Sequence, residues 1–199
     1  MAPADACQTR RVFISHVDSG LEKLLRTRLP LPEEMGDVSF DPPSGNWSAQ
    51  LSRITVNLFL YDIQRSNQPS APTTRSLDGG PAQRRRPQPM MQLGYLVSAW
   101  AGSPRDEHQL LGDVVSIMAG VEAIPDDLLP DELSSTVRLG LGDSDNKVRE
   151  IWAASGGSLK ASFSLMVTVA ADTFDWELTP PSVERISGMA SRMDDGPNA

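Results

Sequence analysis

The sequence predicts an α+β fold, a mixed and mostly antiparallel sheet of about four strands with two main helices packed on it. Three stretches, residues 54–61, 91–101 and 161–171, alternate apolar with polar side chains, as half-buried strands do. Two others, residues 13–28 and 103–118, repeat apolar side chains at helical spacing. With 199 residues, 39% of them hydrophobic, the chain is long enough to bury one sizeable core.

The first helix is predicted from Phe13 to Arg28, because its pattern stops at Pro30. Residues 29–47 are rich in proline and should form a loop with a short extended piece near residues 38–40. The apolar stripe of the helix consists of Phe13, Val17, Leu21, Leu24 and Leu25.

The strands that follow differ in how their two faces should be covered. Both faces of residues 54–61 carry apolar side chains, so both should be at least partly buried. Residues 91–101 have one plainly apolar face and one mixed face, and residues 161–171 alternate in the same way. The apolar face of the middle stretch consists of Met91, Leu93, Tyr95, Val97 and Ala99.

The second main helix has a strong start signal at Ser103, which can cap it, and at Pro104, which suits the first helical position. Asp106 and Glu107 then lie where the helix dipole favours acidic groups. The core stripe of this helix consists of Leu110, Leu111, Val114, Val115 and Met118.

Two shorter elements complete the domain, a strand from Thr136 to Leu139 and a helix from Lys147 to Ala154. One long connection contains many prolines and no hydrophobic periodicity, and the end of the chain has only a weak helical pattern. The predicted organisation is a flexible N-terminus (residues 1–10), one domain (11–171) with a flexible insertion (66–89), and a C-terminal arm (172–199).

The formal charge of −8 argues against a nucleic-acid partner, because non-specific binding to phosphates depends on positive charge. No apolar run approaches the length of a membrane-spanning helix, and we expect neither an export signal nor a span. The single cysteine, Cys7, cannot form an intrachain disulfide, and cytosolic folding is the simplest interpretation.

We find no motif that predicts an enzyme, a metal site or a cofactor site. His16 and His108 belong to no metal-binding pattern. Ser144 begins both an S-x-x-K and an S-D-N match, yet the K-T-G strand of penicillin-binding enzymes is absent. Carboxylate pairs such as residues 106–107 and 126–127 are more typical of caps and solvated faces than of acid/base catalysis. A small hydrolase that uses Ser144 or an unrecognised carboxylate stays open as an alternative.

Partner-contact candidates come from the two segments predicted to lie outside the core. A dense basic cluster in the insertion could dock on an acidic neighbour, and sparse apolar residues in the arm would gain order only on a partner. The aromatic side chains of the strands are more typical of core or subunit contacts than of a ligand cage. The candidate interface residues are Arg84, Arg85, Arg86, Trp176, Val183, Ile186 and Met193.

Four stretches, in this order and spacing, resemble one known family. They are "VSFDPPSGNW" with "LSRITVNLFLYDIQRSNQ", then "RRPQPMMQLGYLVSAWA", then "DEHQLLGDVVSIM", and finally "IWAASGGSLKASFSLMVTV". The set is similar to the cap, or tail-terminator, proteins of extracellular contractile injection systems, which are related to contractile phage tails. The resemblance covers about residues 12–171. Ser98 and Gln109 stand where family members usually have threonine and arginine.

The resemblance implies a tail-terminator-like fold and a homo-hexameric ring that closes the distal end of the inner tube and the contractile sheath. Its partners would be the inner tube protein and the sheath protein. Such a ring acts by binding alone, which is consistent with the absence of catalytic motifs. It would assemble in the bacterial cytoplasm and then belong to a particle that is released or retained. A small adaptor that binds a peptide or partner protein at its sheet edge is the second alternative.

Overall fold

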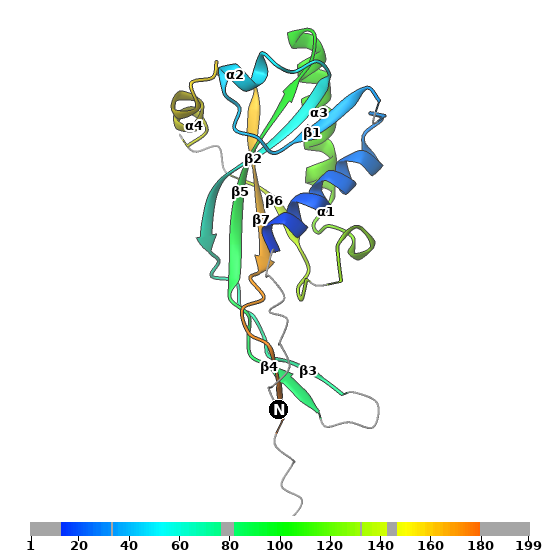
Figure 1. The fold of residues 1–199 in the computed structure, drawn as a ribbon, viewed down its shortest axis with the longest axis vertical. Coiled ribbons are helices and arrows are strands. Elements are labelled where there is room, and N and C mark those ends of the chain that lie inside the picture. Colours follow the sequence, from blue (N-terminus) through cyan, green and yellow to red (C-terminus); the bar gives the residue numbers. More distant parts are fainter. Residues whose placement is uncertain (1–12, 33, 77–81, 132, 143–146, 180–199) are drawn as a thin grey trace, which may run out of the picture.

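The computed structural model describes residues 13–179 apart from 33, 77–81, 132 and 143–146 (Figure 1). Its strands form two sheets, one of five strands and one of three. The helices are α1 (Phe13–Arg28), α2 (Gly45–Ser48), α3 (Pro104–Gly120) and α4 (Lys147–Ser155), with a 3-10 helix η1 at Asp126–Leu128. The strands are β1 (Gly36–Ser39), β2 (Ile54–Arg65), β3 (Thr73–Arg75), β4 (Gln83–Arg85), β5 (Met90–Trp100), β6 (Arg138–Leu141), β7 (Ser162–Ala170) and β8 (Trp176–Leu178).

The five-stranded sheet has the order β1-β2-β5-β7-β6 and confirms the predicted α+β class. Only β1 runs parallel to its neighbour, and the other three pairs are antiparallel. The sheet has one strand more than the four expected, because the short extended piece near residue 38 pairs with the start of β2. Strand β6 begins at Arg138, two residues later than predicted.

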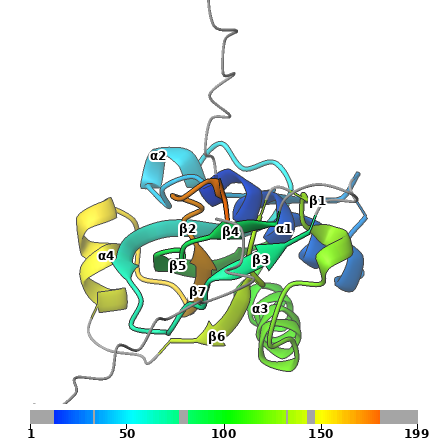
Figure 2. The ribbon, with the colours of Figure 1, turned by 90° about the horizontal axis from the view of Figure 1, so that it is seen from below.

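Helices α1 and α3 lie together on one side of this sheet, and α4 lies on the other (Figure 2). The predicted stripe of α1 is buried at Val17, Leu21, Leu24 and Leu25. These side chains pack with Val114 and Met118 of α3 and with the apolar faces of β2, β5 and β7 in one hydrophobic cluster. Burial of apolar side chains on this face holds the helices on the sheet.

The second face of the sheet is covered near its upper end by tryptophans. Trp100 of β5 lies between Trp47 of α2 and Trp152 of α4, with ring centroids 5.3 Å and 6.2 Å away. The Lys160 ammonium lies 3.9 Å from the centre of the Trp100 ring and forms an ion pair with Glu107 of α3. Both faces of β2 are therefore buried at residues 55–58, as the sequence predicts, with Thr55 and Asn57 as inaccessible as Val56 and Leu58.

The three-stranded sheet, which we call the small sheet, has the order β3-β4-β8. It projects from one end of the five-stranded sheet and its helices, which we call the body (Figure 1). Both of its ladders are antiparallel. The sequence predicted no regular structure in residues 66–89, yet β3 and β4 lie there, and β8 comes from the segment predicted as a separate arm. The flexibility of that insertion stays a prediction.

Within the described residues, no helix is long and apolar enough to cross a membrane. The same residues contain no group of three or more His, Cys, Asp or Glu side chains placed to share a metal ion.

Candidate partner-binding surface

The small sheet brings together four of the predicted interface residues. In the β4–β8 ladder, Arg84 lies opposite Glu177 and Arg85 lies opposite Trp176. Arg86 follows directly and forms an ion pair with Glu177, with Nη2 and Oε1 3.0 Å apart. Val183, Ile186 and Met193 lie outside the described residues, so their predicted role is untested.

Two arginines hold the indole ring of Trp176. The Cζ atoms of Arg75 and Arg85 lie 4.2 Å and 4.7 Å from the ring centroid. Strand alternation places these three side chains on one face of the small sheet, since Arg85 pairs with both Trp176 and Thr73. Each cation–π contact of this kind is worth about 0.5–1 kcal/mol at an exposed site. The indole therefore links all three strands.

The chain between β7 and β8 is fixed to the body as well. Asp172 adopts a left-handed conformation, φ 47°, and its Oδ2 accepts a hydrogen bond from the Ser134 backbone N–H at 3.1 Å. Its other oxygen lies 3.7 Å from Nη1 of Arg85, and both side chains are mostly buried. The side chain of Gln88 bonds to the backbone of Phe174. Residues 172–179 are thus part of the folded subunit.

The three predicted arginines differ in what they do. Arg85 contacts Asp172 and the indole, and Arg86 contacts Glu177 and lies 4.5 Å above the ring of Phe174. Arg84 is exposed on the opposite face from the indole, and it forms no ion pair with any described residue. Arg84 is therefore the exposed arginine of the cluster without an ion pair among the described residues, while the Arg86 side chain, paired with Glu177, is 60% exposed as well.

Strand β8 is an edge of the small sheet among the described residues. The Thr179 N–H donates to the Ala82 carbonyl at 2.8 Å, so residues 177 and 179 turn their backbone groups toward β4. Trp176 and Leu178 consequently turn theirs toward the open edge. Leu178 is also 66% exposed. Such an edge can pair with a further strand.

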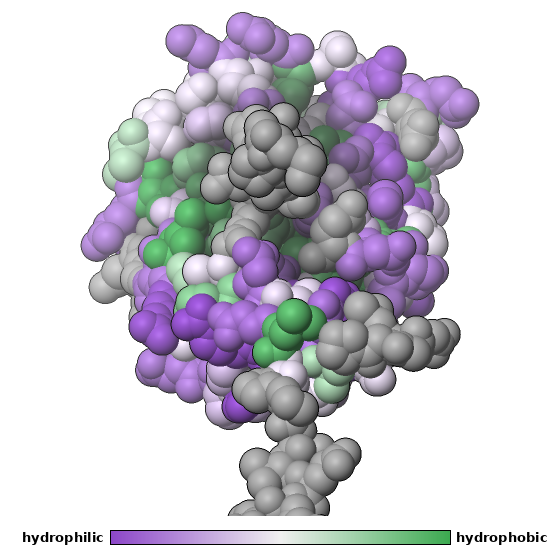
Figure 3. Space-filling view, turned by 60° about the horizontal axis from the view of Figure 1, so that its bottom comes forward, coloured by the Kyte–Doolittle hydropathy of each residue, from purple (hydrophilic) through white to green (hydrophobic). Residues whose placement is uncertain are grey.

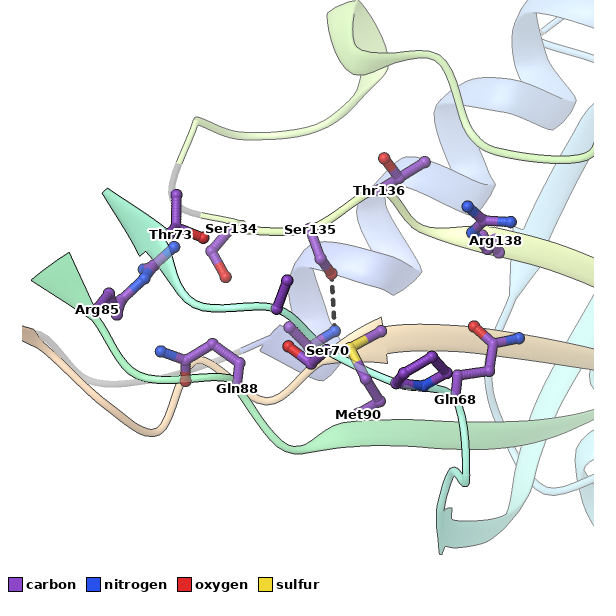
Figure 4. A pocket seen from close by; sticks show the side chains of 13 residues that line it. Gln68, Ser70, Thr73, Arg85, Gln88, Met90, Ser134, Ser135, Thr136 and Arg138 are labelled. Carbon is purple, nitrogen blue, oxygen red and sulfur yellow. Dashed lines mark hydrogen bonds between the residues drawn. The ribbon is translucent and has the colours of Figure 1, made fainter. Parts of the chain in front are cut away.

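A pocket of about 510 Å³ lies at the root of the small sheet (Figure 4). Its two charged lining residues are Arg85 at one end and Arg138 at the other, and hydroxyl groups line much of the space between them. Ser135 contributes one of these hydroxyls, which accepts a hydrogen bond from the Ala170 N–H at 2.8 Å. Seen from this end, the molecule is mostly hydrophilic, with apolar residues in separate areas (Figure 3).

One titratable pair lies in the core. The Tyr95 hydroxyl donates to Oδ1 of Asp18 at 2.7 Å, which links β5 to α1. Burial raises the pKa of the Asp18 carboxyl, and the hydrogen bond from Tyr95 opposes that rise. Burial and the neighbouring carboxylate raise the pKa of Tyr95 as well.

Ser144, the candidate nucleophile, lies outside the described residues.

A family model described as the Pvc16 N-terminal domain matches residues 16–185, most of the chain. The chain belongs to this family. No curated protein matches it.

The fold of this Pvc16 N-terminal domain is shared with two solved structures. One is the sheath/tube terminator of PVC, an extracellular contractile injection system, in its extended state. Its TM-score is 0.65 and its sequence identity is 20%, over 91% of this chain and 64% of that chain. The other is the tube-terminating cap of the anti-feeding prophage. Its TM-score is 0.55 and its sequence identity is 17%, over 90% of this chain and 60% of that chain. The chain thus spans less than two-thirds of either structure's length, and the predicted resemblance to cap proteins is confirmed.

The sequence of this Pvc16 N-terminal domain predicted Trp176 and the arginines as partner contacts and did not predict their contacts with one another. It selected Trp176 and the arginine cluster but missed Arg75, Gln88 and Phe174. A three-residue strand has too few positions to show periodicity, and its partner strand lies about ninety residues away in the chain. The proline-rich composition around Arg75 instead favoured a loop.

Proposed function

We propose that this chain is a structural cap of a contractile injection particle. Six copies form a ring that closes the distal end of the inner tube and the sheath and stops their polymerisation. The observation that carries the proposal is the fold shared with two terminators over nine-tenths of the chain, together with membership of the family. Assembly takes place in the bacterial cytoplasm, and the finished particle is released or retained.

Head-to-tail polymers need such a component. A tube that grows through one repeated interface always exposes an unpaired end, and it keeps adding layers unless a subunit matches that end and offers no equivalent face beyond it. Shape and surface chemistry are sufficient for this task. No catalytic group is required, and the cap is accordingly proposed as a non-enzymatic protein.

The body and the small sheet have different roles in this proposal, the first as a rigid support and the second as the partner contact. The five-stranded sheet is covered on both faces near α2 and α4, which supplies a rigid block. The small sheet presents an open strand edge at Trp176 and Leu178 and the exposed guanidinium of Arg84. We place the sheath contact on this edge and on residues 180–199, where a strand can be added to a neighbouring sheet.

Electron microscopy of particles from cells that lack this chain tests the function. We expect tubes of uncontrolled length or sheaths that detach, and a return to uniform particles when the wild-type chain is supplied from a plasmid. Particles of normal length with stable sheaths in the deletion strain would contradict the proposal.

The open edge of β8 also suits an adaptor that binds an extended peptide as a monomer. An adaptor would leave tube length unchanged when deleted, and its mass in solution would be that of one chain. The same two measurements therefore separate the cap from the adaptor.

A further inference from the structure

Gln88 makes the two hydrogen bonds that a neighbouring strand would make. The residue follows β4 and is 7% exposed. Its Nε2 donates to the Phe174 carbonyl at 2.8 Å, and its Oε1 accepts from the Phe174 N–H at 2.9 Å. A side chain thereby satisfies both backbone groups of a residue 86 positions later in the chain.

Strand β8 needs such help, because its ladder is only three residues long. Three attachments follow one another along the chain. The Gln88 amide forms hydrogen bonds with Phe174, two arginines stack on Trp176, and the Thr179 N–H donates to the Ala82 carbonyl. The first of these lies in the short link between the body and β8, after the contacts of Asp172 with Ser134 and Arg85, and it is the attachment nearest to the start of that strand.

We propose that Gln88 is a positioning residue for the partner-binding surface. It fixes the path of the chain from β7 to β8, and so sets the position of the open β8 edge and the direction in which the chain continues past Thr179. Ordering these residues in the free subunit removes an entropy cost from partner binding. The link to a sheath partner rests on the proposed function, whereas the ordering of β8 does not.

Amide hydrogen exchange of the isolated subunit tests the ordering. In Gln88→Ala, peptides covering residues 172–179 should exchange on the order of tenfold faster than in the wild type, because loss of both bonds allows β8 to open locally. Gln88→Asn, whose shorter side chain cannot make both bonds without a shift, should give a smaller increase. Gln92→Ala, a glutamine of β5 with partial exposure, is the matched control and should leave these peptides unchanged.

Peptides of β5 and β7 report whether each variant is folded. Unchanged exchange of residues 172–179 in a folded Gln88→Ala protein would overturn the inference. If that protein failed to fold, Gln88→Asn would decide the question by the same measurement.

Particles assembled with each variant test the link to the partner. Gln88→Ala should reduce the fraction of particles that keep the sheath attached at the capped end, while Gln92→Ala should not. Faster exchange with wild-type sheath retention would overturn the positioning role in partner binding. Such a result would leave the capping proposal intact, because that proposal is tested by removal of the whole chain.

Discussion

The hydrogen bond between Tyr95 and Asp18 joins two titratable side chains at the core. Tyr95 has no exposed surface, and its hydroxyl reaches the Asp18 carboxylate of α1 at 2.7 Å. The sequence predicted Tyr95 on the core face of its strand, which is confirmed. It did not predict the partner, because Asp18 lies 77 positions away and only the folded chain brings them together.

We expect Asp18→Asn to change how stability depends on pH. The carboxyl pKa is raised above 3.8 in the folded state, so the folded state binds the proton more tightly than the unfolded chain. Wild-type stability should therefore fall, relative to that of the variant, as pH rises from 3.8 through the raised pKa. An asparagine keeps an acceptor for the Tyr95 hydroxyl and carries no charge.

Urea denaturation at several pH values between 4 and 7 measures this difference in the free energy of unfolding. Glu22→Gln, which removes a carboxylate from the same helix at a surface ion pair with Arg26, is the control for the loss of one carboxylate. Equal pH profiles for wild type and Asp18→Asn would argue against the raised pKa. Tyr95→Phe should destabilise by about 1–3 kcal/mol, because the buried carboxylate loses its donor.

At the scale of elements, local signals located the long helices and two of the short strands, β1 and β6, but failed for the strands of the small sheet. Helix α1 has the predicted bounds, and Ser103 caps α3 as expected, since its Oγ accepts from the Asp106 N–H at 3.3 Å. Helix caps and the apolar faces of amphipathic helices depend on residues within a few positions of each other. Strand β8 depends on pairing with the distant β4, which no local pattern encodes, and β3 and β4, although close in sequence, are three residues long each and show no periodicity.

Two truncations separate the structural and the binding roles of the C-terminal segment. Removal of residues 180–199 leaves β8 in place. Removal of residues 174–199 takes away Phe174 and Trp176, so the buried amide of Gln88 loses both of its hydrogen bonds to Phe174. Only the longer truncation should lower the free energy of unfolding, by about 1–3 kcal/mol. Both should loosen sheath attachment in purified particles.

Chemical denaturation of each purified subunit and electron microscopy of the particles are the measurements. Full sheath retention after removal of residues 174–199 would refute the contact with the sheath. Equal stability of the two truncated proteins would show that β8 contributes little to the subunit.

At the scale of the whole molecule, the proposed ring predicts a mass. Light scattering of the purified subunit with the tube protein of its particle should give a complex that contains about six times the 21.6 kDa of one chain. The subunit alone should give about six times the mass of one chain if the ring forms without the tube. A mass of one chain in both samples would favour the monomeric adaptor.

The continuity of β5 and β7 has a mechanical consequence. Their ladder runs from Ser98 opposite Ser162, beside the tryptophans, to Met90 opposite Ala170, where the small sheet begins. A pull on the small sheet acts along these strands, across hydrogen bonds that lie perpendicular to them. Because β5 and β7 both connect to the small sheet at this end, the load is divided between two strands of the body. If the proposed sheath contact lies at this end, the force of a contracting sheath would reach the body through both strands at once.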